Sequence, residues 1–129
     1  MRAVDTNIII RFLTNDDAEQ AARARRLFDH EDVFVPIPVL LETEWVLRAV
    51  YGFAAADVVG ALRRFAGLPH VSVENASVAA QALDWADHGL DLADALHLAA
   101  AQQHDGFISF DRQLARIARK LGAPEVAVP

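Results

Sequence analysis

The chain has 129 residues, of which 53% are hydrophobic and 23% are charged. That length suits one domain of about 100–150 residues, so we expect a single domain over residues 1–129. The hydrophobic fraction excludes a wholly disordered chain. Eighteen acidic residues against twelve basic ones give a formal charge of −6, which argues against nucleic-acid binding through an overall basic surface. An enzyme that meets phosphate through a bound metal is not excluded.

The chain has no cysteine, which rules out disulfides, thiolate metal sites and cysteine nucleophiles. The absence of a signal-peptide core and of a run of about 20 apolar residues predicts that the protein has no membrane association. We therefore expect a cytoplasmic protein.

Short apolar runs alternate with longer segments of helical period along the chain. Strands are expected, in chain order, at residues 2–5, 33–36, 70–73, 106–109 and 125–128. Helices are expected at residues 7–13, 18–28, 38–51, 57–65, 76–87, 92–102 and 112–120, with Thr6 capping the first and Asp111 the last. Strands separated by helices imply crossover connections, and these predict an α/β fold with a parallel sheet covered by helices on both faces.

Ligands of an open α/β sheet bind beyond the carboxyl ends of its strands. Four acids stand at such positions: Asp5 ends the first strand, Glu42 follows the second, Asp94 begins the helix before the fourth, and Asp111 follows the fourth. We expect all four at one edge of the sheet. Simpler interpretations remain open for two of them, because Asp111 is also placed to be a helix cap and Asp94 to be an acid favoured by the helix dipole.

The helix after the second strand carries two acids, and their helix positions differ. Glu42 has apolar neighbours at three and four residues, so its face is predicted to point toward the core. Glu44 shares a stripe with Arg48 and is interpreted as half of a solvated ion pair. Glu42 is therefore the candidate site residue.

Four converging carboxylates repel one another unless protonation, a captured arginine or a divalent cation relieves the repulsion. Oxygen ligands favour Mg²⁺ or Mn²⁺, and the five histidines lack zinc-site spacing. His97 is expected to be a packed helix residue or a neighbour of the metal ligands. With no nucleotide-binding or serine-hydrolase motif present, hydrolysis of a phosphodiester by metal-activated water is the simplest reaction. Asn7 and Ser109 are candidates to orient carboxylates or water.

The motifs that carry these acids are Asp5-Thr6-Asn7, Glu42 at the end of residues 38–42, Asp94 at the start of residues 94–99, and Asp111 at the end of residues 107–111. In this order, and over essentially the whole chain, they resemble the PIN-domain family. Within it, the chain is most similar to the VapC-type toxins of bacterial toxin–antitoxin pairs. The resemblance implies a three-layer α/β/α sandwich on a central parallel sheet of four to five strands, with Mg²⁺- or Mn²⁺-dependent endoribonuclease activity.

The resemblance also implies roles and partners. Asp5 and Asp94 would be the principal metal ligands, and Glu42 and Asp111 would complete the acidic quartet. The accessory positions are matched by Asn7 and by Ser109, which stands where the family more often has threonine; Asp91 either caps a helix or adds to the pocket. The implied partners are RNA, a second copy of the chain in a homodimer, and an antitoxin whose C-terminal segment covers the active site.

Other functions fit the sequence less well. A phosphoacceptor receiver domain needs adjacent acids after the first strand and a lysine ending the last, but Asp5 stands alone and Lys120, the only lysine, lies on a helix. A PIN nuclease in RNA processing or DNA cleavage, and a PIN fold without activity, are further alternatives. Five arginines are candidates for RNA contact, but scattered helix arginines are more typical of an ordinary solvated surface, so no role is assigned to them. They are Arg11, Arg48, Arg112, Arg116 and Arg119.

Overall fold

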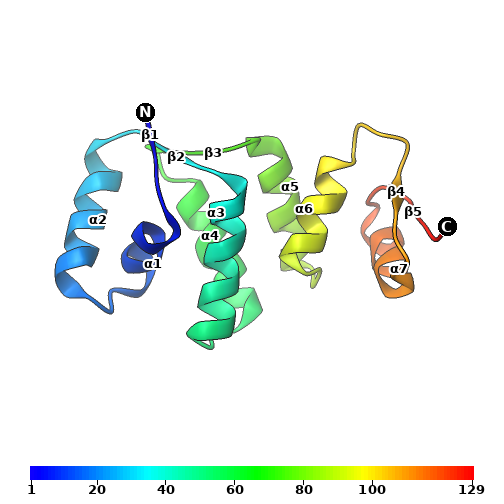
Figure 1. The fold of residues 1–129 in the computed structure, drawn as a ribbon, viewed down its shortest axis with the longest axis horizontal. Helices are drawn as coiled ribbons and strands as arrows, with labels where there is room; N and C mark the ends of the chain where they lie inside the picture. The colour runs from blue at the N-terminus through cyan, green and yellow to red at the C-terminus, as the bar shows by residue number, and fades with distance from the viewer. The chain divides into compact units, whose positions relative to one another are not determined.

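The computed structural model describes residues 1–129 and divides into two compact units, Met1–Ala76 and Ser77–Pro129 (Figure 1). Each unit is described by itself. No helix in the structure is both long and apolar enough to cross a lipid bilayer.

The first unit is built on a parallel sheet with the strand order β1-β2-β3. Its elements are β1 (Arg2–Ala3), α1 (Thr6–Thr14), α2 (Ala18–His30), β2 (Val33–Val35), α3 (Ile37–Trp45), the π-helical turn η1 (Val46–Val50), α4 (Ala55–Ala66) and β3 (Val71–Val73). The register pairs Arg2 with Val33 and Val33 with Val71. Because both crossovers step in the same direction across the sheet, and crossovers are nearly always right-handed, their helices lie on the same face.

An aromatic cluster forms the centre of the helical layer in the first unit. The ring centroids of Phe12 and Phe28 are 5.0 Å apart, those of Phe28 and Phe65 5.1 Å, and those of Phe12 and Phe65 5.9 Å. The edge-to-face and tilted geometries are those that aromatic pairs prefer. The other large side chains buried in this core are Ile9, Ile10, Val33, Val35, Leu40 and Leu62. This packing holds together α1, α2 and α4, which belong to the two segments that connect the strands of the sheet.

The second unit consists of most of α5 (Ala76–Asp87), then α6 (Leu92–Ala100), β4 (Phe107–Ile108), α7 (Arg112–Leu121) and β5 (Val126–Ala127). Strands β4 and β5 pair in parallel, and α7 packs against β5 (Figure 1). Gly106 has φ +129°, and a Cβ there would lie 3.1 Å from the carbonyl oxygen of Glu125. Glycine is therefore required where the two strands approach each other.

The α/β class and the parallel sheet are confirmed, and all five strands lie where they were expected. The prediction of one sheet with four to five strands is wrong: the sheet has three strands, and β4 and β5 form a separate pair. The reason is local, since each of these two strands has two residues and they satisfy each other's backbone groups, with Phe107 N donating to Glu125 O at 2.9 Å and Ser109 N to Ala127 O at 3.0 Å. The third layer of the sandwich and the single-domain organisation stay predictions.

Candidate active site

Asp5 stands where β1 gives way to α1. Its backbone is extended, with φ −87° and ψ 162°, and its Oδ1 accepts a hydrogen bond from the backbone N–H of Thr6 at 2.8 Å. Asp5 is thus the N-cap of α1, and Thr6 is the first helical residue. The prediction that Thr6 caps this helix is wrong, because the extended residue that precedes the helix is the one whose side chain reaches the free backbone N–H groups.

Thr6 connects Asp5 to Glu42. Its side chain is 3% exposed, and its hydroxyl donates a short hydrogen bond to Oε1 of Glu42 on α3. The first unit therefore brings two of the four predicted acids to the same residue, although they are 37 positions apart in the sequence. Sequence reasoning gave Thr6 only the role of a cap; its position directly after the site acid Asp5 is the signal that could have identified it.

The predicted orientation of the two acids on α3 is wrong. Glu42 is exposed, whereas Glu44 is 5% exposed and accepts a hydrogen bond from Nε of Arg48 at 2.8 Å. The ion pair is confirmed, but its Glu44 half is buried, with a side chain 7% exposed against 38% for that of Arg48. The core face of α3 consists of Leu40, Thr43 and Glu44. The apolar neighbours that suggested a buried Glu42 include Trp45, whose side chain is 54% exposed.

These positions predict opposite phenotypes for two matched substitutions. Glu44→Gln should lower the free energy of unfolding by about 1 kcal/mol, because it weakens a buried charge-assisted hydrogen bond. Glu42→Gln should leave the stability nearly unchanged and lower RNA cleavage about ten-fold or more. Urea unfolding and a cleavage assay on both variants check this. Equal losses of activity per folded molecule would contradict the assignment of Glu42.

The second unit carries the other two predicted acids. Asp91 is the N-cap of α6, with its Oδ2 accepting from the backbone N–H of Asp94 at 3.3 Å, which confirms the cap interpretation. Asp94 lies half-buried in the first turn. Burial raises the pKa of the Asp94 carboxyl above its ordinary value, the negative charges of Asp91 and Asp111 raise it further, and His97 partly opposes them. Asp94 and Asp111 are therefore electrostatic neighbours.

Asp111 is the N-cap of α7, and its Oδ1 accepts from the backbone N–H of Leu114 at 3.0 Å. The backbone N–H of Asp111 donates to Oγ of Ser109 at 3.0 Å, so the serine orients the backbone that carries this acid. His97 is exposed, and its ring stacks on that of Phe107 with a centroid distance of 6.1 Å. The expectation that His97 is a packed helix residue is wrong, because it does not lie on the buried face of α6. That face consists of residues 92, 95, 96, 98 and 99.

The charge around these acids is uncompensated. Within its own unit, none of Asp5, Glu42, Asp94 and Asp111 forms an ion pair with arginine or lysine. Carboxylate oxygens without a cationic partner are suitable ligands for a hard divalent cation, and such a cation would relieve the repulsion that raises the pKa of Asp94. Neither unit by itself arranges three histidine, aspartate or glutamate side chains around a metal position. The four-acid site stays a prediction.

A groove lies between α1 and α2. It has a volume of about 530 Å³ and is lined by Asn7, Ile8, Arg11, Gln20, Arg23, Ala24 and Leu27. Asn7, the predicted accessory residue in the first turn of α1, is exposed and belongs to this lining. The groove therefore contains one predicted site residue, which lies two positions after Asp5 in the sequence.

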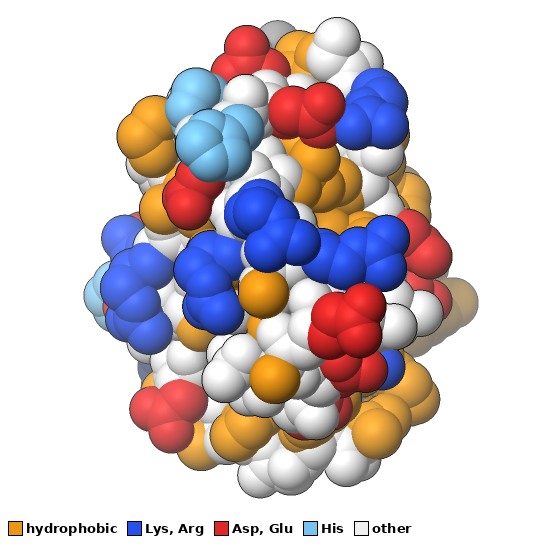
Figure 2. Space-filling view, turned by 90° about the vertical axis from the view of Figure 1, so that its left-hand side faces the viewer, with side chains coloured by type: hydrophobic (Ala, Val, Ile, Leu, Met, Phe, Trp, Pro, Cys, Tyr) orange, Lys and Arg blue, Asp and Glu red, His pale blue; other side chains and the backbone are white.

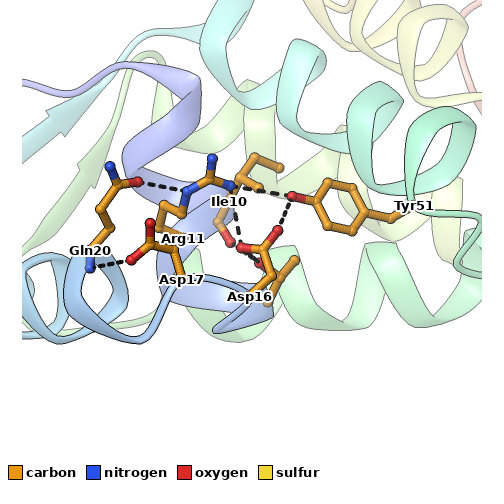
Figure 3. Close-up of polar contacts among 7 residues, drawn as sticks. Ile10, Arg11, Asp16, Asp17, Gln20 and Tyr51 are labelled. Atoms are coloured by element: carbon orange, nitrogen blue, oxygen red, sulfur yellow. Dashed lines mark hydrogen bonds and ion pairs between the residues drawn. The ribbon is translucent and has the colours of Figure 1, made fainter.

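Arg11 is fixed on one side of this groove by three polar partners (Figure 3). Its Nε donates to Oε1 of Gln20 at 2.7 Å, and its Nη1 lies 3.3 Å from both Oδ1 of Asp16 and the hydroxyl of Tyr51. The Tyr51 hydroxyl also donates to Oδ2 of Asp16 at 2.7 Å, and that of Thr14 to Oδ1 at 2.9 Å. These hydrogen bonds lower the pKa of Asp16, with Tyr51 making the largest contribution.

The lowered pKa predicts a pH-dependent effect of Tyr51→Phe. Because the folded state lowers the pKa of Asp16 below its ordinary value of 3.8, this carboxylate stabilises the fold above that pH, and the stabilisation is lost as the pH falls through the lower, folded-state pKa. Removing the hydroxyl should therefore destabilise the chain at pH 7, and the difference from wild type should shrink toward pH 3. Urea unfolding at both pH values measures it; an equal difference at the two would contradict the role given to Asp16.

Comparison with known proteins places these features in a family. The family model described as "PIN domain" matches residues 2–120, which include all four acids, Asn7 and Ser109. A search of curated proteins found no match.

Proposed function

The chain belongs to the PIN domain family, and on this premise we propose that it is a Mg²⁺- or Mn²⁺-dependent endoribonuclease and the toxin of a VapC-type toxin–antitoxin pair. The family match over residues 2–120 carries the proposal. PIN domains have a nuclease fold, are generally nucleases and typically bind a divalent metal. The uncompensated acids agree with this activity, since a cation is the partner that they lack within each unit.

We assign roles to the residues as follows. Asp5 and Asp94 hold the metal, and Glu42 and Asp111 complete the acidic pocket. The cation, when bound, lowers the pKa of a water molecule and stabilises negative charge on the phosphodiester. Thr6 keeps the carboxylate of Glu42 in one orientation through its hydroxyl. The helix caps made by Asp5 and Asp111 fix the backbone at both acids, so that substrate binding does not have to order them.

The proposed partners also have physical support. An arginine from an antitoxin segment would satisfy the acids by charge-assisted hydrogen bonds and would compete with the cation. Trp45, Val50 and Phe53, at and after the end of α3, are 54%, 66% and 48% exposed. Large exposed apolar side chains favour a protein-binding surface, such as the interface of a homodimer.

Removal of the metal tests the enzymatic part of the proposal. The purified chain should cleave total RNA in Mg²⁺ or Mn²⁺, cleavage should stop in EDTA, and an excess of Mg²⁺ should restore it. The cut sites, mapped by primer extension, should be reproducible between preparations. Cleavage that continues at the same sites in EDTA would contradict metal dependence.

Expression in growing cells tests the toxin part. The wild-type chain should arrest growth and the Asp5→Asn variant should not. Co-expression of an antitoxin with an arginine-containing C-terminal segment should relieve the arrest. Cleavage of RNA in vitro without growth arrest would contradict the toxin role and favour a PIN nuclease that acts in RNA processing.

A further inference from the structure

Basic side chains form a band across the face seen from the α2 side (Figure 2). On α2 itself the exposed arginines are Arg23, Arg25 and Arg26. Arg23 forms no hydrogen bond or ion pair in the structure, although its helix contains several acids. An exposed guanidinium that no acid neutralises is available to an anionic ligand.

Arg23 and Arg25 lie on different sides of α2. Arg23 lines the α1–α2 groove together with Asn7, which lies two residues after the site acid Asp5. Arg25, by contrast, lies on the opposite side of the helix, because the α2 residues that line the groove are 20, 23, 24 and 27. The charge of Arg23 is therefore inside the groove that contains the candidate accessory residue Asn7, and the charge of Arg25 is outside it.

The groove also has an apolar part and a fixed polar wall. Ile8, Ala24 and Leu27 supply aliphatic surface, and Arg11 is held by Gln20, Asp16 and Tyr51 (Figure 3). Because Arg11 is already bonded in this geometry, a ligand does not have to order it. The volume of about 530 Å³ is in the range of about 300–1,000 Å³ that is typical of ligand sites. A ligand with a phosphate next to a less polar ring suits such a lining.

We propose that the α1–α2 groove binds the RNA strand next to the phosphodiester that is cleaved, with Arg23 contacting a backbone phosphate and Ile8 and Leu27 packing against the adjoining ribose or base. This inference rests on the proposed endoribonuclease function and adds the path of the substrate to it. The net charge of −6 does not oppose such binding, because the contact depends on a local charge in a defined groove. Contacts to phosphate position a nucleic acid without selecting its sequence.

Binding without cleavage tests the groove. The Asp5→Asn chain in Mg²⁺ is titrated with fluorescein-labelled oligouridylate, and the anisotropy gives the Kd at several salt concentrations. Adding Arg23→Gln should raise the Kd about five-fold and lower the slope of log Kd against log salt by about 0.7, the value for one contact to a single strand. Arg25→Gln, which removes the same charge from the same helix, should change the Kd less than about two-fold. Arg23→Lys should keep most of the affinity, since lysine also binds phosphate.

The outcomes separate this inference from the proposed function. Equal effects of Arg23→Gln and Arg25→Gln on the Kd, with thermal midpoints unchanged, would contradict RNA binding in the groove. Cleavage of RNA by the wild type would still support the nuclease function. A wild-type chain that does not cleave RNA would contradict the nuclease function, whatever the Kd values. Tighter binding of oligoglutamate than of oligouridylate, lost in Arg23→Gln, would overturn the proposal in favour of an acidic protein segment as the occupant.

Discussion

Replacing Asp5 by asparagine should lower RNA cleavage by at least about 100-fold and leave the chain folded. Asparagine keeps the acceptor for the backbone N–H of Thr6 and is an equally good N-cap, so α1 should still begin at the same residue. What the substitution removes is the negative charge that is proposed to hold the metal, and losing a direct ligand should cost more than the 10- to 100-fold typical of residues that only support ligands. Cleavage rates and circular dichroism of both proteins measure the two halves of this prediction.

Asp17→Asn is the matched control for Asp5→Asn. Asp17 is also an aspartate N-cap, with its Oδ1 accepting from the backbone N–H of Gln20 at 3.0 Å, but it lies outside the candidate site. It should therefore have little effect on cleavage. If both substitutions reduced cleavage equally, the role of Asp5 would be that of a cap, and the metal-ligand assignment would be wrong.

Phe65→Ala should have the largest effect on stability, a loss of about 3–5 kcal/mol in the free energy of unfolding. Phe65 is 2% exposed and contacts both Phe12 and Phe28, so truncation removes aromatic contacts and leaves a cavity among α1, α2 and α4. Since α1 carries Asp5 and one wall of the groove, cleavage should fall together with the folded fraction. Urea unfolding followed by circular dichroism gives the free energy.

Phe53→Ala provides the comparison at an exposed position. Phe53 is 48% exposed and stacks only on Tyr51, at a centroid distance of 6.0 Å, so its loss should cost less than about 1 kcal/mol. A loss at Phe53 as large as that at Phe65 would show that the aromatic cluster is not the centre of the core.

The two predicted halves of the site differ in what supports them. In the first unit, Thr6 joins Asp5 and Glu42 by hydrogen bonds. In the second, burial raises the pKa of Asp94, and the negative charge of Asp111 contributes to the same shift. Both halves place acids at helix N-termini, where capping keeps the backbone ordered, and this shared feature is consistent with a rigid set of ligands in the proposed enzyme.

Features that depend on a few neighbouring residues were predictable from the sequence alone. The five strand positions and the caps at Asp91 and Asp111 follow from short apolar runs and from side chains that reach nearby backbone N–H groups. Three of the candidate acids, Asp5, Asp94 and Asp111, were found in the same way, because they follow a strand or lie at the start of a helix.

Only the tertiary structure decided which face of each element is buried and what lies beside it. Periodicity assigned Glu42 to the core and Glu44 to the surface. In the structure Glu42 is exposed and Glu44 is buried, where its carboxylate accepts a hydrogen bond from Arg48. The hydrogen bond from Thr6 to Glu42 and the groove beside Arg23 join residues on different helices, so no local pattern contains them. Local propensity is set within a few residues, whereas burial, pairing and grooves arise when distant segments pack together.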